Sequence, residues 1–153
     1  MPLNYTMLKL NIREFIQENT FFLKQKKISI NKMIKDYSNS NFGEDITMYY
    51  FNRRGYNITF VYNELENIII AEQIEITILD EIEDVFLKKI ISIENYKKEL
   101  NNMIDSIYCD DSEKVVFMKN GINAHFNNGL LSKITSKSDI TRDFVMKFMD
   151  KIT

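Results

Sequence analysis

Apolar and polar residues alternate along two stretches of the chain, at residues 56–62 and 122–127. Successive side chains of a β-strand point to opposite faces, so this alternation predicts strands with one buried face and one mostly polar face. A short apolar run precedes each stretch, and the turns between them, Arg53-Arg54-Gly55 and Lys119-Asn120-Gly121, end in glycine. Glycine supplies the positive φ that a tight turn needs, so each stretch is predicted to belong to a β-hairpin.

The two hairpins repeat at one fixed offset. Between residues 50–68 and 116–134 the identical pairs are Phe51 and Phe117, Gly55 and Gly121, Asn57 and Asn123, Phe60 and Phe126, Leu65 and Leu131, and Ile68 and Ile134. Chance matches do not share one offset, so we infer an internal duplication. An extension (1–28) is then followed by two units (29–91 and 92–153), each predicted as a helix, three strands and a helix. Neither unit can bury its sheet and helices alone, so we expect one α+β domain, residues 1–153, with a mostly antiparallel sheet and a pseudo-twofold axis between the units.

The first half of the chain predicts the following elements. Residues 11–17 indicate a helix that turns Phe15 and Ile16 inward, after a short strand near residues 7–12. Unit one is expected to have a helix at 30–38 and strands at about 46–53, 56–62 and 65–71. Beyond residue 71 the alternation fits either a fourth strand or one long, bent third strand. Asp80 is predicted to cap a helix that carries Ile82, Val85, Phe86 and Ile90, with Glu83 completing a capping box.

Unit two is predicted to repeat this order. Ser92 caps a helix that extends to Ile104, and residues 110–112 form a loop. Strands are expected at about 114–119, 122–127 and 130–135. Asp139 opens a last helix, whose buried stripe is expected to consist of Ile140, Phe144, Val145, Phe148 and Ile152.

Composition narrows the class of protein only broadly. The 153 residues are 44% apolar and 27% charged, as is usual for a soluble globular protein. A net charge of −2 gives no general attraction to nucleic acid or to membranes, and no stretch resembles a membrane span or a signal peptide. The single cysteine excludes an internal disulfide. We therefore expect a cytoplasmic protein without a membrane partner, with nucleic acid disfavoured as a ligand.

Candidate chemistry centres on the only histidine, His125, and the only cysteine, Cys109. Residue types alone allow a thiol–imidazole dyad, but the strand pattern predicts that His125 is an exposed side chain on the polar face. The single histidine has no ligand spacing for zinc, and all four glycines fall in turns rather than in a phosphate-binding loop. Asp110, Asp111 and Glu113 are interpreted as a solvated turn rather than a cation site. No catalytic residue, metal or cofactor is therefore expected.

Acidic residues are concentrated in one segment. Residues 64–87 contain no lysine or arginine and hold these acids: Glu64, Glu66, Glu72, Glu75, Asp80, Glu81, Glu83 and Asp84. The run predicts either a merely solvated face or a surface that complements a basic partner. In the second interpretation the partner-binding residues are Glu64, Glu66, Glu72, Glu75, Asp80, Glu83 and Asp84, together with Tyr62. Tyr62 and Tyr50 are the candidates for a partner-facing aromatic patch.

The repeated pattern, aromatic–x3–Gly–x–Asn–x2–Phe–x4–Leu–x2–Ile at 51–68 and 117–134, resembles one found in small bacterial immunity proteins. Those proteins neutralise toxins of contact-dependent inhibition and polymorphic toxin systems. The resemblance implies a small acidic cytoplasmic protein that binds one cognate toxin domain and has no catalytic activity. The alternatives are an accessory or assembly module of bacterial or phage origin, including a homodimer, and a small enzyme that uses Cys109 and His125. A nucleic-acid contact would involve Lys24, Lys26, Lys27, Lys32 and Lys35.

Overall fold

A computed structural model describes residues 12–18, 38–41, 45–66, 68–136 and 139–152. Within these residues one antiparallel sheet of nine strands has the order β1-β2-β3-β4-β8-β7-β6-β5-β9. The strands are β1 Ser38–Asn41, β2 Ile46–Arg53, β3 Tyr56–Asn63, β4 Ile68–Ile76, β5 Ile104–Cys109, β6 Glu113–Met118, β7 Asn123–Asn127, β8 Leu130–Thr135 and β9 Asp150–Lys151. The helices are α1 Ile12–Glu18, α3 Val85–Lys89, α4 Ile93–Leu100 and α5 Asp139–Phe148, with 3-10 turns η2 Leu79–Glu81 and η3 Asn101–Met103. The predicted α+β class with antiparallel pairing is confirmed.

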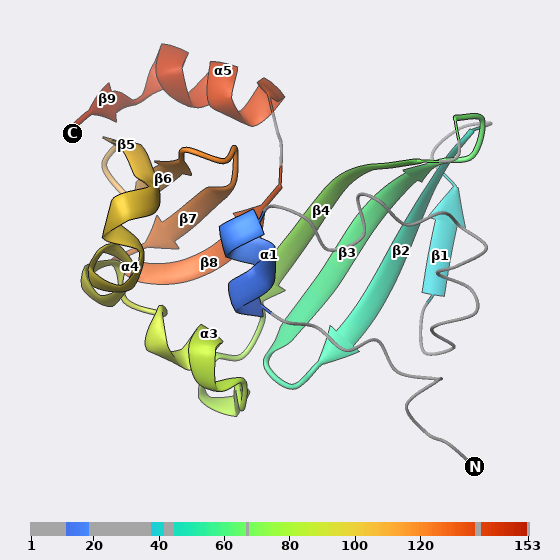
Figure 1. Ribbon diagram of the computed structural model, residues 1–153, viewed down its shortest axis with the longest axis horizontal. Helices are drawn as coiled ribbons and strands as arrows, with labels where there is room; N and C mark the ends of the chain where they lie inside the picture. Colours follow the sequence, from blue (N-terminus) through green and yellow to red (C-terminus); the bar gives the residue numbers. More distant parts are fainter. Residues whose placement is uncertain (1–11, 19–37, 42–44, 67, 137–138, 153) are drawn as a thin grey trace.

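The sheet consists of two meanders joined through their last long strands. β1 to β4 follow one another, β5 to β8 do the same, and β4 pairs with β8 around Ile74 and Ile134. Figure 1 shows the sheet curling sharply at this junction, with the helices distributed around the curl.

One row of cross-strand partners runs through the sheet and forms the centre of its inner face. Because directly paired residues of antiparallel strands share a face, the row is defined by the pairing. It consists of Phe51, Ile58, Ile74, Ile134, Ala124, Val116 and Ile107, all buried. Burial of one continuous apolar row across both meanders is the main stabilising contact between them.

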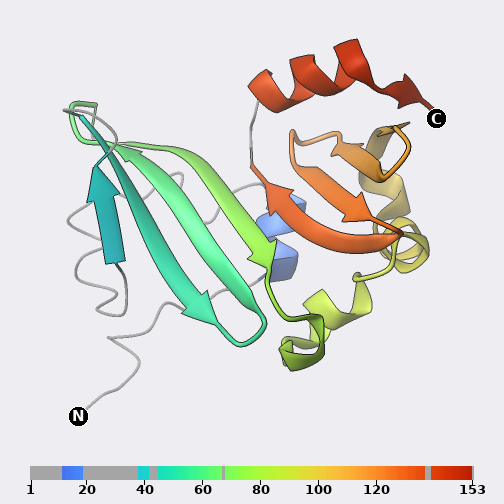
Figure 2. The ribbon, with the colours of Figure 1, turned by 180° about the vertical axis from the view of Figure 1, so that it is seen from behind.

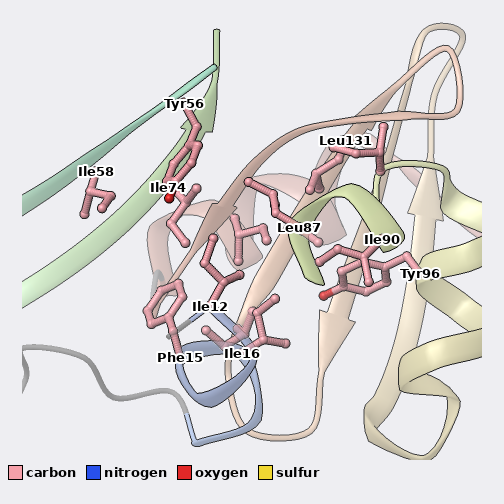
Figure 3. Packing of buried hydrophobic residues seen from close by; sticks show 14 of the residues in the cluster. Ile12, Phe15, Ile16, Tyr56, Ile58, Ile74, Leu87, Ile90, Tyr96 and Leu131 are labelled. Carbon is pink, nitrogen blue, oxygen red and sulfur yellow. The ribbon is translucent and has the colours of Figure 1, made fainter. Parts of the chain in front are cut away.

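Three helices cover this inner face. α1 inserts Ile12, Phe15 and Ile16 between the strands and the α3–α4 segment, where Leu87 and Ile90 meet them (Figure 3). The inward positions predicted for Phe15 and Ile16 are confirmed. Asn120, in the turn before β7, fixes the end of α1, since its side-chain amide donates hydrogen bonds to the carbonyls of Ile16 (2.6 Å) and Gln17 (3.1 Å). These bonds satisfy carbonyl groups that a helix end leaves without a partner.

α5 covers the opposite, outer face of the sheet, over β5 and β6. Val145 and Met149 pack there against Tyr108, Val115 and Phe117. The predicted stripe is therefore wrong in three members: Phe144 is 59% exposed, Phe148 62% exposed and Ile152 49% exposed. Val145 and Met149 form the buried stripe, and Phe144 and Phe148 lie on the neighbouring, exposed one.

The turns of the two hairpins differ in length by one residue. This difference changes the face of the sheet on which the side chains before the turn lie. In the first, Arg53 pairs with Tyr56 across a two-residue turn, whereas in the second the Met118 N–H donates to the Ile122 carbonyl (2.8 Å) across a three-residue turn. One added residue moves a strand's side chains to the other face. Phe51 therefore lies in the inner core while Phe117, its partner in the sequence repeat, lies under α5.

The prediction of three strands per unit is wrong. Each meander has a further strand, β1 or β5, and the third predicted strand of unit one extends as a single β4 to Ile76. The helix from Ser92 ends at Leu100 rather than Ile104. Both faces of β5 are buried, so its sequence lacks the alternation that identified the other strands. The helix predicted at 30–38 and the strand near residues 7–12 lie mostly outside the described residues, although Ser38 belongs to β1 and Ile12 to α1.

Helix capping was predicted correctly at one of two sites. The Ser92 side chain accepts a hydrogen bond from the Asn95 N–H (3.2 Å), as expected. The α3 cap is Asp84, which accepts from the Leu87 N–H (2.8 Å), and not Asp80, which lies in η2. Burial of Leu87 and Ile90 sets where this helix begins, and that burial depends on contacts with distant residues.

Candidate functional site

A hollow of about 450 Å³ lies on the outer face of the first meander, and we call it the outer hollow. Its lining residues come from β2, β3, β4 and the end of β8: Met48, Tyr50, Asn57, Thr59, Val61, Ala71, Glu72, Gln73, Glu75, Lys133, Thr135 and Ser136. Figure 2 shows this side of β2, β3 and β4 with no described helix over it. The strands that carry these side chains form an antiparallel ladder, with one register shift in the β3–β4 pair between Val61 and Tyr62.

Cross-strand pairing arranges the lining in three rows of different chemistry. The apolar row consists of Met48, Val61 and Ala71. The hydroxyl row consists of Tyr50, Thr59, Gln73 and Thr135. The charged row consists of Asn57, Glu75 and Lys133. Adjacent rows are about 7 Å apart because each is two residues further along the strands. The outer hollow is therefore apolar at one end, has hydrogen-bonding groups in the middle, and is charged at the other end.

Two features of the outer hollow are suited to holding a ligand. The Thr135 hydroxyl is buried and has no hydrogen-bond partner among the described residues, so its desolvation is not compensated within them. Glu75 and Lys133 are direct cross-strand partners of opposite charge, yet no ion pair joins them in the described part of the chain. Both charges therefore remain available to groups of a bound molecule.

The charged row and the hydroxyl row continue under α5. Beyond Lys133 the charged row passes through His125 and Val115 to Tyr108, and beyond Thr135 the hydroxyl row passes through Asn123 to Phe117. α5 packs on the Tyr108, Val115 and Phe117 end of these rows. One face of the sheet thus has a helix over its second half and the outer hollow over its first half.

His125 is buried, only 4% exposed, so the prediction that it is an exposed strand residue is wrong. It does lie on the outer face as expected, but its neighbours on that face are packed under α5. Burial lowers the pKa of His125, the positive charge of Lys133 lowers it further, and Glu113, whose carboxylate lies 3.5 Å from Nδ1, partly opposes both effects. Its Nε2 atom has no hydrogen-bond partner among the described residues. The imidazole is therefore held neutral at pH 7.

Strand pairing separates the residues of the predicted dyad. Cys109 pairs with Lys114, which pairs with Phe126, so its side chain lies on the face of Phe126. His125 lies on the face of Val115 and Tyr108, the opposite side of the sheet. A thiol–imidazole dyad between Cys109 and His125 is excluded in this fold.

The acidic segment does not form one surface. Glu64 and Glu66 lie at the turn before β4, and Asp80, Glu83 and Asp84 follow its other end. The nine residues of β4 separate these ends by about 30 Å. Several of these acids already have partners within the chain: Glu64 accepts from Thr47 (3.0 Å), Glu83 pairs with Arg54 (2.7 Å), and Asp84 caps α3.

Two of the predicted partner-binding residues are buried. Tyr62 is 0% exposed, with its ring edge against Tyr49 (6.3 Å between centroids), and Glu72 is 3% exposed opposite Phe60. Neither reaches a partner from the surface, because both lie on the inner face with Phe60. Of the predicted set, Glu72 and Glu75 line the outer hollow, but only Glu75 is exposed there; Tyr50, from the predicted aromatic pair, also lines it.

The other candidates are explained locally or lie outside the described residues. The Asp110 carboxylate accepts from the N–H groups of Ser112 (2.9 Å) and Glu113 (2.8 Å), which lowers the pKa of Asp110 and makes this loop a hydrogen-bonded turn. In the described ranges no three His, Cys, Asp or Glu side chains gather as metal ligands would. None of the described helices has the length and apolarity that crossing a bilayer requires. The lysines between residues 24 and 35 lie outside the described ranges.

Sequence reasoning missed Thr59, Gln73, Lys133 and Thr135 as a group. Each sits at an ordinary outward position of a predicted strand; Thr59 and Gln73 meet through the β3–β4 pair, and Lys133 and Thr135 join them only because β4 pairs with β8. The available signal was the set of polar residues at alternate positions of the first hairpin, and these residues were interpreted as solvent-exposed.

Comparison with protein-family models, with curated proteins and with solved structures finds no match to this chain. The site is therefore interpreted from its own geometry.

Proposed function

We propose that this chain is a non-catalytic binding protein that engages one partner protein through the outer hollow. The observation that carries the proposal is the half-covered outer face: α5 covers the sheet over β5 and β6, and the continuous rows over β2 to β4 lie in a hollow instead. An apolar row next to hydrogen-bonding and charged groups provides both the apolar contact area and the polar contacts of a protein-binding surface.

The proposed partner is a cognate toxin domain, which makes the chain an immunity protein. The resemblance of the repeated hairpin to immunity proteins supports this class of partner. Glu75 and Lys133 carry the accessible charge of the outer hollow, where Glu72 is buried, and the other predicted acids lie at the two ends of β4. Recognition therefore rests on shape and paired charges more than on a broad acidic surface.

The experiment is affinity capture of the tagged chain from its source organism at moderate salt, with mass spectrometry of what co-elutes. Thr59→Arg places a long charged side chain in the middle of the outer hollow. Thr77→Arg is the matched control, because Thr77 is exposed just beyond β4 and outside the hollow. We expect one stoichiometric partner that Thr77→Arg retains and Thr59→Arg loses, with both variants melting as the wild type does.

Recovery of the chain alone would contradict the proposal, as would equal capture by Thr59→Arg. If a partner is captured, its expression without this chain should arrest growth, and co-expression of the wild-type chain should restore growth. If the captured partner does not arrest growth, it is not a toxin, and the proposal of a binding protein stands without the immunity function.

We also propose that the two meanders arose by tandem duplication. Three features support it: the shared strand order within each meander, the antiparallel β4–β8 contact between them, and the positive φ of both Gly55 (82°) and Gly121 (96°) at matched turns. The one-residue difference between the turns then represents a later change that placed Phe117 on the outer face, where α5 covers it.

A further inference from the structure

We infer that the outer hollow receives an amphipathic α-helix of the partner, with two apolar residues spaced i, i+4 packed on the sheet. This inference rests on the proposed function and specifies the part of the partner that is bound. The occupant is argued from three observations: the helix already bound to the same rows, the width of the hollow, and its unpaired charges.

The first observation is the continuity of the outer hollow with the contact of α5. Val145 of α5 and Met149, directly after the helix, pack four residues apart on Tyr108, Val115 and Phe117, and the Met149 N–H donates to the Val145 carbonyl (2.9 Å). Tyr108 and Val115 belong to the charged row of the outer hollow, and Phe117 belongs to its hydroxyl row. The outer face that α5 covers over β5 and β6 therefore continues, through the charged and hydroxyl rows, into the outer hollow.

The second observation is the width of the outer hollow. The hollow spans β2, β3, β4 and β8, and neighbouring strands are about 4.8 Å apart, so its floor is about 14 Å wide. An α-helix with its side chains has a diameter of about 10–12 Å. Met48, Val61 and the ring of Tyr50 form the part of the floor that would contact two apolar residues on one side of such a helix.

The third observation is the charged row. Glu75 and Lys133 lie side by side as cross-strand partners and form no ion pair with each other within the described part of the chain. Residues i and i+4 of a helix are about 6 Å apart, close to the separation of paired cross-strand side chains. A lysine and a glutamate at that spacing on the partner helix would meet Glu75 and Lys133, which fixes the direction in which the helix lies.

The test uses the full chain and labelled alanine-rich peptides of about 18 residues, long enough to be helical in water. Three peptides carry Leu/Leu, Val/Met or Phe/Phe pairs at i, i+4 with a neighbouring lysine, and a control carries the same residues at i, i+2, on different sides of the helix. Fluorescence anisotropy measures binding. At least one i, i+4 peptide is expected to bind saturably, about tenfold more tightly than its control, with Thr59→Arg losing this binding and Thr77→Arg keeping it.

A charge exchange provides a second readout that does not depend on packing. Glu75 is exposed, so Glu75→Lys is expected to fold, and it should weaken binding of the lysine-bearing peptide about two- to fivefold, as an exposed ion pair does. A peptide with glutamate in place of that lysine should regain the loss on Glu75→Lys alone.

Three results would overturn the inference. One is that no i, i+4 peptide binds more tightly than its control, and another is equal binding by Thr59→Arg. The third is concentration-dependent dimerisation in sedimentation that Thr59→Arg abolishes, which would assign the outer hollow to a second copy of this chain. If the peptides fail while the captured partner still depends on Thr59, the helix is wrong and the proposed function stands. If no partner is captured at all, the proposed function itself fails.

Discussion

Replacing Gly55 with alanine tests how the tip of the first hairpin is held against the segment that follows β4. A Cβ atom at this position would lie 2.6 Å from the Ile78 carbonyl oxygen, 2.7 Å from Ile82 Cγ1 and 2.8 Å from the Ile82 nitrogen. Two of these atoms belong to the backbone, and the Gly55 carbonyl also accepts the N–H groups of Thr77 (2.8 Å) and Ile78 (3.1 Å). The contact therefore cannot open without moving the chain beyond β4.

Two costs contribute to the expected loss of stability. The φ of +82° lies in the left-handed region, where a Cβ atom costs about 1–2 kcal/mol. Forcing an additional carbon into a packed contact costs about 1–3 kcal/mol. We expect Gly55→Ala to lower the free energy of unfolding by about 3–4 kcal/mol, which is roughly 10 °C in Tm for a chain of this size.

Gly129→Ala is the matched control. Gly129 has nearly the same φ, +78°, but a Cβ atom there would have no neighbour within 4 Å. Only the backbone cost applies, so the expected loss is about 1–2 kcal/mol. Urea unfolding followed by circular dichroism measures both values. Equal losses for the two variants would refute the steric argument, and a loss at Gly55 below that at Gly129 would show that the tip is not packed as described.

Three further predictions concern single side chains. Asp84→Ala should cost about 1 kcal/mol in urea unfolding because it removes the α3 cap, whereas Asp80→Ala should change stability by less than about 0.5 kcal/mol; equal effects would contradict the cap assignment. His125 has a lowered pKa in the fold, so the unfolded chain binds its proton first. The contribution of His125 to the free energy of unfolding should be complete above pH 6.5, its ordinary pKa, and should decline as the pH falls below that value. The urea midpoint should therefore fall between pH 7.5 and pH 5, and His125→Gln should reduce this dependence on pH. An unchanged dependence on pH in His125→Gln would refute the prediction. Tyr96 buries a hydroxyl with no hydrogen-bond partner among the described residues, so Tyr96→Phe should leave the urea midpoint unchanged or raise it, and a clear drop would reveal a missed partner.

The strands of the two hairpins could be predicted from the sequence, although both faces of β6 and β7 are buried. β2, β3, β7 and β8 were placed within a residue or two, because alternation and turn glycines are local signals that the fold retains. The alternation also predicts that Tyr62 is buried, since Tyr62 and Phe60 point to the same face of β3. Its assignment to the partner surface contradicted the same pattern.

The structural features that the sequence analysis predicted wrongly or missed depend on contacts between distant residues. β5 was not predicted, and its first residue, Ile104, was assigned to the preceding helix, because α5 buries the face of β5 that would otherwise have been polar. His125 was placed correctly on the outer parity, but only the packing of α5 over this end of the rows explains its burial. The outer hollow requires β4 to pair with β8, which no local pattern specifies. The acids of residues 64–84 are adjacent in sequence and separated in space because an extended strand lies between them.

Methyl NMR of the chain with and without its captured partner tests the outer hollow most directly as the binding surface. Met48, Val61, Ala71 and Thr59 place methyl groups within it, while Val85 on α3 and Met146 on α5 are exposed elsewhere. We expect the methyl signals of the outer hollow to shift on binding and those of Val85 and Met146 to remain unchanged. Shifts confined to Val85, Met146 or the Leu65 turn, with unchanged signals in the outer hollow, would contradict it.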